Sequence, residues 1–287
     1  MLPFLKWPGG KRWLAKDLAK IISNQLRGRY YEPFLGGGAV FFALQPPSAT
    51  LSDINGDLIN VYCQVKEHPA LILERLQKLP ISHEDYYSIR EQDPGNPIDR
   101  AVRFLYLNRT AFGGIYRLNP EGKFNVPYGG GERTPEPLWR DRLLVNASQA
   151  LQNTDLIRTD FQEIINRAGP GDVIYCDPTY SVAHENNGFI RYNEKNFSWS
   201  DQERLAKLVK KACERGAIIF VSNAFHNSLI NLYSPFDHLC LSRKSCVSRN
   251  IEARREVKEI LFLISPENFK EDLLHSAKLY MINRLSN

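Results

Sequence analysis

Long apolar stretches are scarce in this sequence. The longest runs, such as Ile260–Ile264, have the length of a β-strand, far below the ~18 residues that a membrane-spanning helix needs. Lys6, Lys11 and Arg12 are not followed by an apolar stretch, so we expect no signal peptide. These absences argue against an integral membrane protein and predict a cytoplasmic location.

Cysteine and metal-binding patterns are scarce as well. The five cysteines contain no C-x-x-C pair, and the six histidines show no H-E-x-x-H spacing. A disulfide framework and a zinc site are therefore disfavoured, and reduced thiols are expected. We predict no bound metal.

Basic residues are in small excess over the whole chain and in larger excess in two stretches. Lys and Arg number 37 against 32 Asp and Glu, a formal charge of +5. Residues 100–142 hold eight Lys or Arg against four Asp or Glu, and residues 243–258 hold six against two. A basic stretch is usually a solvated face. In the first stretch, however, aromatic residues and glycines lie among the basic ones, and this combination favours nucleic-acid binding.

The apolar pattern predicts an α/β fold. Residues 11–26 and 39–44 have helical character, residues 29–34 and 49–52 have strand character, and residues 55–112 predict several helices without a clear strand. Strands and helices alternate again after about residue 151, with strands at 156–158, 173–176, 217–221, 239–241 and 257–264 and helices at 161–168 and 201–215. We therefore predict a Rossmann-like sheet, interrupted by a mainly helical insertion that contains a hairpin.

A glycine turn follows the first predicted strand. Gly36–Gly38 opens a helix whose N-terminus favours negative groups. The chain lacks the third glycine of a dinucleotide fingerprint, and it has no P-loop pattern. Such a turn alone is more often structural, but Asp53 at the end of the next strand favours a ligand with ribose hydroxyls.

A second motif, Asp177-Pro178-Thr179-Tyr180, follows the strand predicted at 173–176. The Asp177 carboxylate and the Pro178 carbonyl offer two acceptors for an NH2 group, and Tyr180 offers a ring on which a base can stack. An ordinary Asp-Pro turn with a packing tyrosine is the alternative. Without further context this alternative is favoured, although the motif lies where α/β sheets bind ligands, at the carboxyl end of a strand.

These motifs belong to a longer series that resembles a known family. Its five stretches, in chain order, are FLKWPGGK (Phe4–Lys11), EPFLGGG (Glu32–Gly38), SDIN (Ser52–Asn55), FLYLNR (Phe104–Arg109) and YCDPTY (Tyr175–Tyr180). Together they resemble the Dam-type, class alpha (D12) site-specific DNA adenine methyltransferases. In that family the cofactor motif comes first, target recognition is inserted, and the catalytic motif comes last. The resemblance spans nearly the whole chain.

The resemblance implies S-adenosyl-methionine as the methyl donor. Lys11 would face its carboxylate, Asp53 its ribose hydroxyls, and Trp7 would supply an aromatic face. The cofactor-binding residues implied by the resemblance are Trp7, Lys11, Phe34, Gly36, Gly38, Asp53 and Asp177. The sulfonium is already an activated methyl donor, so the chemistry needs no metal.

The resemblance also implies that the acceptor is the N6 amine of adenine in double-stranded DNA, reached by base flipping. Asp177 and Pro178 would hold the amine, and Tyr180 would stack on the flipped base. The remaining task is to orient the lone pair of the amine toward the methyl carbon. Thr179 departs from the family, which usually has a second proline there; the turn becomes less rigid, and we expect activity to survive.

Target recognition would lie in the insertion. By the resemblance, residues 1–56 and 150–287 form the catalytic domain and residues 57–149 the DNA-binding domain. Phe112 would act as a wedge, with Ile115 and Arg117 as base readers. The DNA-binding residues implied are Arg109, Phe112, Ile115, Arg117, Asn119 and Arg133. Because arginine pairs well with guanine edges, GATC is a hypothesis for the target.

Several alternatives stay open at this point. A catalytically silent homologue could bind DNA or the cofactor, and an active one could methylate RNA adenine or the N4 amine of cytosine. An initial Asp rather than Ser or Asn in the catalytic motif weakens the last two, and the lack of a Pro-Cys nucleophile argues against cytosine C5. The sequence leaves open whether the enzyme is solitary, part of a restriction–modification system or carried by a phage. No obligate protein partner is expected.

Overall fold

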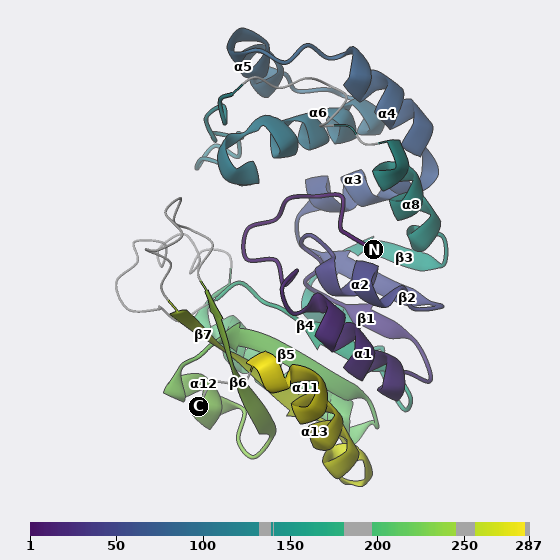
Figure 1. Cartoon of the computed structure of the whole chain (residues 1–287), viewed down its shortest axis with the longest axis vertical. Helices are drawn as coiled ribbons and strands as arrows, with labels where there is room; N and C mark the ends of the chain where they lie inside the picture. Colours follow the sequence, from purple (N-terminus) through teal and green to yellow (C-terminus); the bar gives the residue numbers. More distant parts are fainter. Residues whose placement is uncertain (132–138, 140, 181–196, 245–255, 285–287) are drawn as a thin grey trace. The chain divides into compact units, whose positions relative to one another are not determined.

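The computed structural model of the chain describes residues 1–131, 139, 141–180, 197–244 and 256–284 (Figure 1). It contains a seven-stranded sheet with the order β3-β2-β1-β4-β5-β7-β6. β1 pairs in parallel with β2 and β4, and β4 with β5, whereas β7 runs antiparallel between β5 and β6. The strands are β1 Tyr30–Glu32, β2 Ala49–Asp53, β3 Thr154–Arg158, β4 Val173–Cys176, β5 Ile218–Ala224, β6 Asp237–Lys244 and β7 Glu256–Ile264.

Packing divides the chain into two compact units. The first unit comprises Met1–Lys16, Leu35–Pro47 and Ser52–Arg158, and the second comprises Asp17–Phe34, Ser48–Leu51 and Thr159–Asn287. The described α-helices are α1 Ala15–Gln25, α2 Ala39–Leu44, α3 Gly56–Glu67, α4 Pro69–Lys78, α5 His83–Glu91, α6 Pro97–Thr110, α8 Asp141–Leu151, α9 Phe161–Ile165, α11 Trp199–Glu214, α12 Asn227–Leu232 and α13 Glu267–Met281.

Helices form most of the first unit. α3 packs against α4, α6 and α8, and α5 packs against α6. Capping side chains fix where two of these helices begin, because they satisfy N–H groups that have no partner within the helix. Asn55 accepts from the N–H groups of Asp57 and Leu58 at the start of α3, and Asn96 accepts from that of Asp99 at the start of α6.

Strands β1, β4, β5, β7 and β6 carry the second unit. β5 is buried along its whole length. α11 packs against α9, β5 and β7, and α13 packs against β7, so Figure 1 shows both helices beside the strands. The order of the strands reverses between β1 and β4, and such a reversal marks where α/β sheets bind ligands. Phe34 lies just after β1, and Asp177 directly follows β4.

The structure confirms the predicted α/β sheet with its helical insertion. β4 and α2 have the predicted bounds, while β3, β5 and β6 extend beyond the predicted runs. The apolar pattern does not predict α8, α12 or α13. In α13 the reason is plain, because its buried residues are only Leu273, Ala277 and Met281, too few to mark an apolar stripe.

Some predictions concern features that packing does not test. The two units cut through the predicted catalytic domain, but they reflect packing and not function, so the functional division stays a prediction.

Over the described ranges, no helix is long and apolar enough to cross a membrane. In the same ranges no group of three or more His, Cys, Asp or Glu residues could hold a metal ion, and Cys63, Cys176, Cys213 and Cys240 are free thiols.

Candidate functional site

The glycine turn follows β1 and is bound to the end of β2. The N–H of Leu35 donates to the carbonyl of Ser52 (2.9 Å), and that of Gly36 donates to Oδ2 of Asp53 (3.0 Å). Gly36 and Gly38 have φ angles of 47° and 63°, which glycine adopts at little cost. The turn therefore brings two of the predicted cofactor residues, Gly36 and Asp53, into direct contact.

The Asp53 carboxylate accepts backbone hydrogen bonds on both oxygens. Besides the bond from Gly36, the N–H of Asn55 donates to Oδ1 at 3.0 Å. Burial raises the pKa of Asp53 above its ordinary value, while the N–H groups of Asn55, Gly36 and Ile54 act in the opposite direction. A carboxylate oxygen can accept more than one hydrogen bond. Asp53 can therefore still accept from hydroxyl groups such as those of a ribose.

Trp7 packs directly on the glycine turn. A Cβ placed on Gly36 would lie 2.9 Å from Nε1 of Trp7, and one on Gly37 would lie 2.8 Å from the Trp7 Cβ. The indole also stacks on the ring of Tyr116, at 5.8 Å between centroids. The glycines are thus required for the approach of Trp7 to the turn, and Trp7 connects the turn to the hairpin that contains Tyr116.

Two other predicted cofactor residues lie in different surroundings. Lys11 is 3% exposed, and its Nζ donates to the carbonyl of Gly9 at 3.3 Å. An ammonium group can form a charge-assisted hydrogen bond with a carboxylate, so the chemistry of Lys11 suits a carboxylate ligand. Phe34, in the second unit, stacks on Phe161 and meets the edge of Phe197.

Asp177 directly follows β4 and is held by the neighbouring strand β5. The hydroxyl of Ser222 donates to Oδ1 of Asp177 at 2.7 Å, and the hydroxyls of Ser222 and Tyr175 lie 2.9 Å apart. Since Ser222 has a single hydroxyl hydrogen and gives it to Asp177, Tyr175 is the donor in the second bond. The three side chains form a chain of hydrogen bonds that ends on the carboxylate and fixes its orientation.

The other residues of the motif differ in exposure. Pro178 is buried, Thr179 is exposed, and Tyr180 is partly buried. The Tyr180 hydroxyl donates to Oε2 of Glu259 at 2.8 Å. Burial and the charge of Glu259 raise the pKa of Tyr180 well above its ordinary value. Tyr180 is therefore a neutral hydrogen-bond donor throughout the physiological pH range.

The predicted recognition hairpin is present in the first unit. Antiparallel bridges join Ala111 to Tyr128 and Leu118 to Phe124. Phe112 is 46% exposed at the start of the hairpin, while Ile115 is partly buried. The roles of Phe112 as a wedge and Ile115 as a base reader stay predictions.

The remaining predicted DNA-binding residues have different environments. Arg117 is exposed, and its Nε donates to Oδ1 of Asn125 at 2.8 Å. Asn119 stabilises the turn of the hairpin, because its Oδ1 accepts from the N–H of Lys123. Arg109 donates to the carbonyl of Phe4 at 2.7 Å and so has a structural contact. Arg133 lies outside the described residues.

Sequence reasoning assigned no role to two residues that contact the catalytic motif, Ser222 and Glu259. The sequence does not show that Ser222 contacts Asp177. Arg243 belongs to the second basic stretch of the sequence, and in the structure it donates to Glu259. Glu259 directly precedes the apolar run Ile260–Ile264 in β7, and a carboxylate at this position is the signal that could have identified it.

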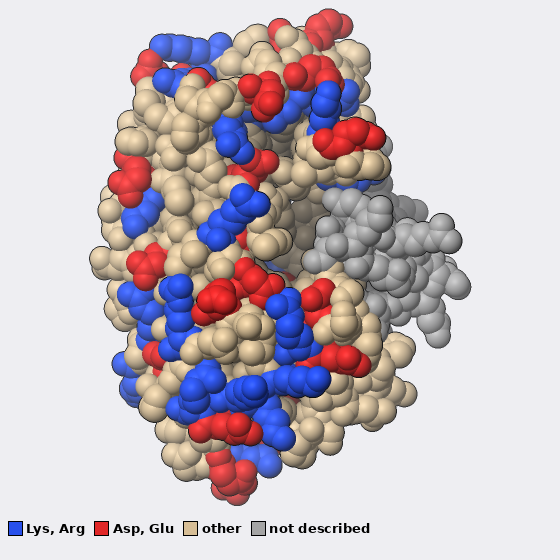
Figure 2. Space-filling view, turned by 180° about the vertical axis from the view of Figure 1, so that it is seen from behind, with Lys and Arg blue, Asp and Glu red and all other residues tan. Residues whose placement is uncertain are grey.

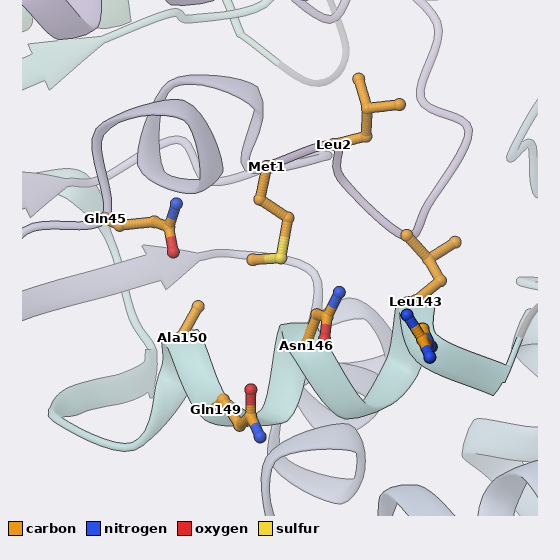
Figure 3. A pocket seen from close by; sticks show the side chains of 8 residues that line it. Met1, Leu2, Gln45, Leu143, Asn146, Gln149 and Ala150 are labelled. Atoms are coloured by element: carbon orange, nitrogen blue, oxygen red, sulfur yellow. The ribbon is translucent and has the colours of Figure 1, made fainter.

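Neither the cavity in Figure 3 nor the charge in Figure 2 marks the motif residues. The cavity, of about 650 Å³, is lined by Met1, Leu2, Gln45, Arg142, Leu143, Asn146, Gln149 and Ala150 (Figure 3). None of these is a predicted site residue. On the face drawn in Figure 2, Lys and Arg side chains lie among Asp and Glu.

The comparison with protein families decides the chain's identity. A family model described as D12 class N6 adenine-specific DNA methyltransferase matches residues 7–256. The chain belongs to this family. Its activity is thus methylation of the N6 amine of adenine in DNA, as the sequence resemblance predicts, and use of S-adenosyl-methionine follows from the family.

Individual relatives of this D12 methyltransferase agree with the family match. The type II methyltransferase M1.LlaDCHI of Lactococcus lactis subsp. cremoris is 33% identical over 270 residues, which cover 90% of this chain and 94% of the relative. The DNA adenine methylase of Vibrio cholerae serotype O1 is 33% identical over 92% of this chain and 96% of its own. The DNA adenine methylase of Escherichia coli (strain K12) is 32% identical over 92% of this chain and 95% of its own. These matches do not test the roles of single residues.

Proposed function

We propose that Asp177 and Pro178 hold the target adenine for methyl transfer, and that Tyr180 stacks on it. The observation that carries this proposal is the 2.7 Å hydrogen bond from Ser222 to Oδ1 of Asp177, at the carboxyl end of β4 where the strand order reverses. The bond fixes the orientation of the carboxylate, which is the proposed acceptor for one N–H of the N6 amine. The Pro178 carbonyl is the second acceptor.

The residues of the catalytic motif perform a positioning and electrostatic task. With both N–H groups of the amine held, the lone pair of the nitrogen is directed away from the two acceptors, toward the methyl donor. Positive charge develops on the nitrogen during transfer, and the Asp177 carboxylate stabilises it. Tyr180 replaces the stacking that the adenine loses when it leaves the duplex.

The residues of the first unit fit S-adenosyl-methionine by their donor and acceptor chemistry. Asp53 accepts from the ribose hydroxyls, Lys11 pairs with the donor's carboxylate, and Trp7 contributes an aromatic surface beside Gly36. Gly38, Phe34 and Asp177 complete the proposed set. When bound, S-adenosyl-methionine supplies a methyl group already activated by its sulfonium. A cytoplasmic location stays a prediction from the sequence.

We propose the hairpin as the part that reads the target, with residues 57–149 as the DNA-binding domain and residues 1–56 and 150–287 as the catalytic domain. Phe112 and Arg117 support this proposal, because both side chains are exposed on the hairpin. An exposed guanidinium can pair with a guanine edge, so GATC is the proposed target. The other proposed DNA contacts are Ile115, Asn119, Arg109 and Arg133.

Methylation mapping tests reaction and target together. Plasmid DNA from cells that express the chain is sequenced by a single-molecule method that detects methylated adenine. We expect adenine to be modified in one short motif, GATC. Modification in another motif would reject GATC, and no modification by folded protein would favour a silent homologue or an RNA substrate.

A matched pair of variants tests the role of Asp177. Asp177→Ala removes the acceptor of the amine, and we expect no detectable methylation with an unchanged melting temperature. Asp93→Ala removes an exposed carboxylate from the loop between α5 and α6, and it should methylate like the unmodified chain. Full methylation by Asp177→Ala would reject the catalytic assignment.

A further inference from the structure

A row of polar side chains crosses one face of the sheet in the second unit. In a β-sheet, paired residues and residues two apart on one strand point to the same face. Tyr175 pairs with Phe220, two residues before Ser222 on β5. Ala224, two residues after Ser222, pairs with Glu259 on β7. Tyr175, Ser222 and Glu259 therefore share a face. Asp177 and Tyr180 contact two of them, so the catalytic motif rests on this row.

Glu259 is a buried carboxylate whose two oxygens have separate partners. Its side chain is 3% exposed. Arg243, on the neighbouring strand β6, donates from Nε to Oε1, and Tyr180 donates to Oε2 at 2.8 Å. Leu241 pairs with Glu259 across the two strands, so Arg243, two residues further on, lies diagonally opposite on the same face.

This arrangement is costly for the fold alone. A buried ion pair contributes little net stability, and apolar side chains of similar volume often serve as well or better. Lys258, just before Glu259 in β7, is charged but exposed, whereas the five residues after Glu259, Ile260–Ile264, are apolar and buried. A buried carboxylate beside this apolar run calls for a role beyond packing, and its direct partner in the catalytic motif is Tyr180.

The bond to Glu259 restrains the ring of Tyr180 from its far end. A tyrosine ring attached only through its Cβ can rotate about two side-chain torsions. The hydroxyl oxygen lies on the axis about which the ring turns, so the bond to Glu259 fixes the direction of this axis. Because a phenolic O–H prefers the plane of its ring, the bond also favours one ring plane. Stacking on a flipped base needs such a fixed plane, because the base must present its amine to Asp177 in one orientation.

We propose that Glu259, held by Arg243, is a positioning residue that fixes the ring of Tyr180 for stacking on the target adenine. This inference rests on the proposed role of Tyr180. Glu259 does not touch the substrate. Its effect passes through one hydroxyl group, so Tyr180→Phe and Glu259→Gln interrupt the same connection from its two ends.

A double-mutant cycle tests that connection. Tyr180→Phe, Glu259→Gln and the double variant are assayed for kcat with saturating S-adenosyl-methionine and DNA that contains the mapped target. We expect each single variant to lose about tenfold in kcat, since a hydrogen bond to a charged group is removed. The kcat of the double variant should be no more than about twofold below that of the less active single variant. Independent, multiplying losses would overturn the proposal.

A second readout separates positioning from a general structural effect. The mapped target adenine is replaced by 2-aminopurine, whose fluorescence is quenched when it stacks on an aromatic ring. Complexes of Glu259→Gln and Tyr180→Phe should be brighter than that of the unmodified chain, with unchanged affinity for S-adenosyl-methionine. Equal brightness would overturn the proposal. Tyr233→Phe is the matched control, because it removes a buried tyrosine hydroxyl that accepts from Gln202 in the same unit, outside the motifs.

The outcomes distinguish this inference from the proposed function. An unmodified chain that methylates no DNA, or an active Asp177→Ala variant, would reject the proposed function itself. If Glu259→Gln does not fold, Tyr180→Phe decides alone: an unchanged kcat would overturn the inference, and a loss of kcat with quenching reduced would support it.

Discussion

Both carboxylate oxygens of Asp53 accept backbone N–H groups, one from Gly36 in the glycine turn and one from Asn55 at the start of α3. Burial raises the pKa of this carboxyl. Only the charged form has both oxygens free to accept from ribose hydroxyls. We therefore expect affinity for S-adenosyl-methionine to fall as the pH is lowered through the pKa of Asp53, and to begin falling at a higher pH than for an ordinary aspartate.

Calorimetric titration over a range of pH checks this expectation. Asp53→Asn should bind more weakly at neutral pH and lose the pH dependence, and an identical pH profile in this variant would contradict the assignment. The stability of the fold depends on pH in the opposite direction, as far as Asp53 is concerned. Because the folded state raises the pKa of Asp53, it holds the proton more tightly than the unfolded state, so this group's contribution to stability is lost as the pH rises.

The sequence could place single residues at strand ends but could not connect them across the sheet. Asp53 and Asp177 follow apolar runs, so their positions at the carboxyl ends of strands could be predicted. The partners of the catalytic motif come from β5 and β7, more than forty residues away, and the register of those strands cannot be deduced from an apolar pattern. Ser222 and Glu259 therefore became candidates only in the structure.

At the scale of elements, the glycine turn between β1 and α2 can be tested by one methyl group. Gly36→Ala places a Cβ 2.9 Å from Nε1 of Trp7 at a φ of 47°. A strained backbone of this kind costs about 1–3 kcal/mol, so we expect the free energy of unfolding to fall by that amount. Affinity for S-adenosyl-methionine should fall too, because the turn carries the N–H that holds Asp53.

Gly95→Ala is the matched control for the glycine turn. Gly95 has nothing within 4 Å of an added Cβ, and it lies in the loop between α5 and α6. Denaturant unfolding of this variant should show unchanged or slightly higher stability, since alanine reduces the freedom of the unfolded chain. If Gly36→Ala and Gly95→Ala lower the free energy of unfolding by the same amount, contact with Trp7 is not the reason why position 36 requires glycine.

Two of the helices that the sequence missed have small buried faces. In β4, which was predicted, all four residues are buried. α12 buries one residue, and α13 buries three among its 15 residues. The hairpin contains two isolated bridges instead of regular strands, and the family resemblance predicts it. Such elements are stabilised by tertiary contacts that a local pattern does not contain.

For the whole molecule, charge distribution matters more than net charge. The formal charge is +5, and acidic side chains lie among basic ones on the face that Figure 2 draws. The basic surplus is concentrated in residues 100–142 and 243–258. A DNA phosphate backbone can be bound by such local groups without a strongly basic protein.

Binding to phosphates releases counterions, so it weakens steeply with salt, whereas a contact such as that proposed between buried Lys11 and the donor's carboxylate is screened much less. We expect DNA affinity to fall at least about tenfold between ~50 and ~200 mM salt, with less than about a twofold change for S-adenosyl-methionine. Fluorescence anisotropy with target and non-target duplexes measures the affinity for DNA, and calorimetry measures the affinity for S-adenosyl-methionine.

Non-target DNA should show a salt dependence close to that of target DNA, because phosphate contacts carry no sequence information. An affinity for DNA that does not change with salt would mean that these basic stretches are solvated faces and that the contacts lie mainly with the bases.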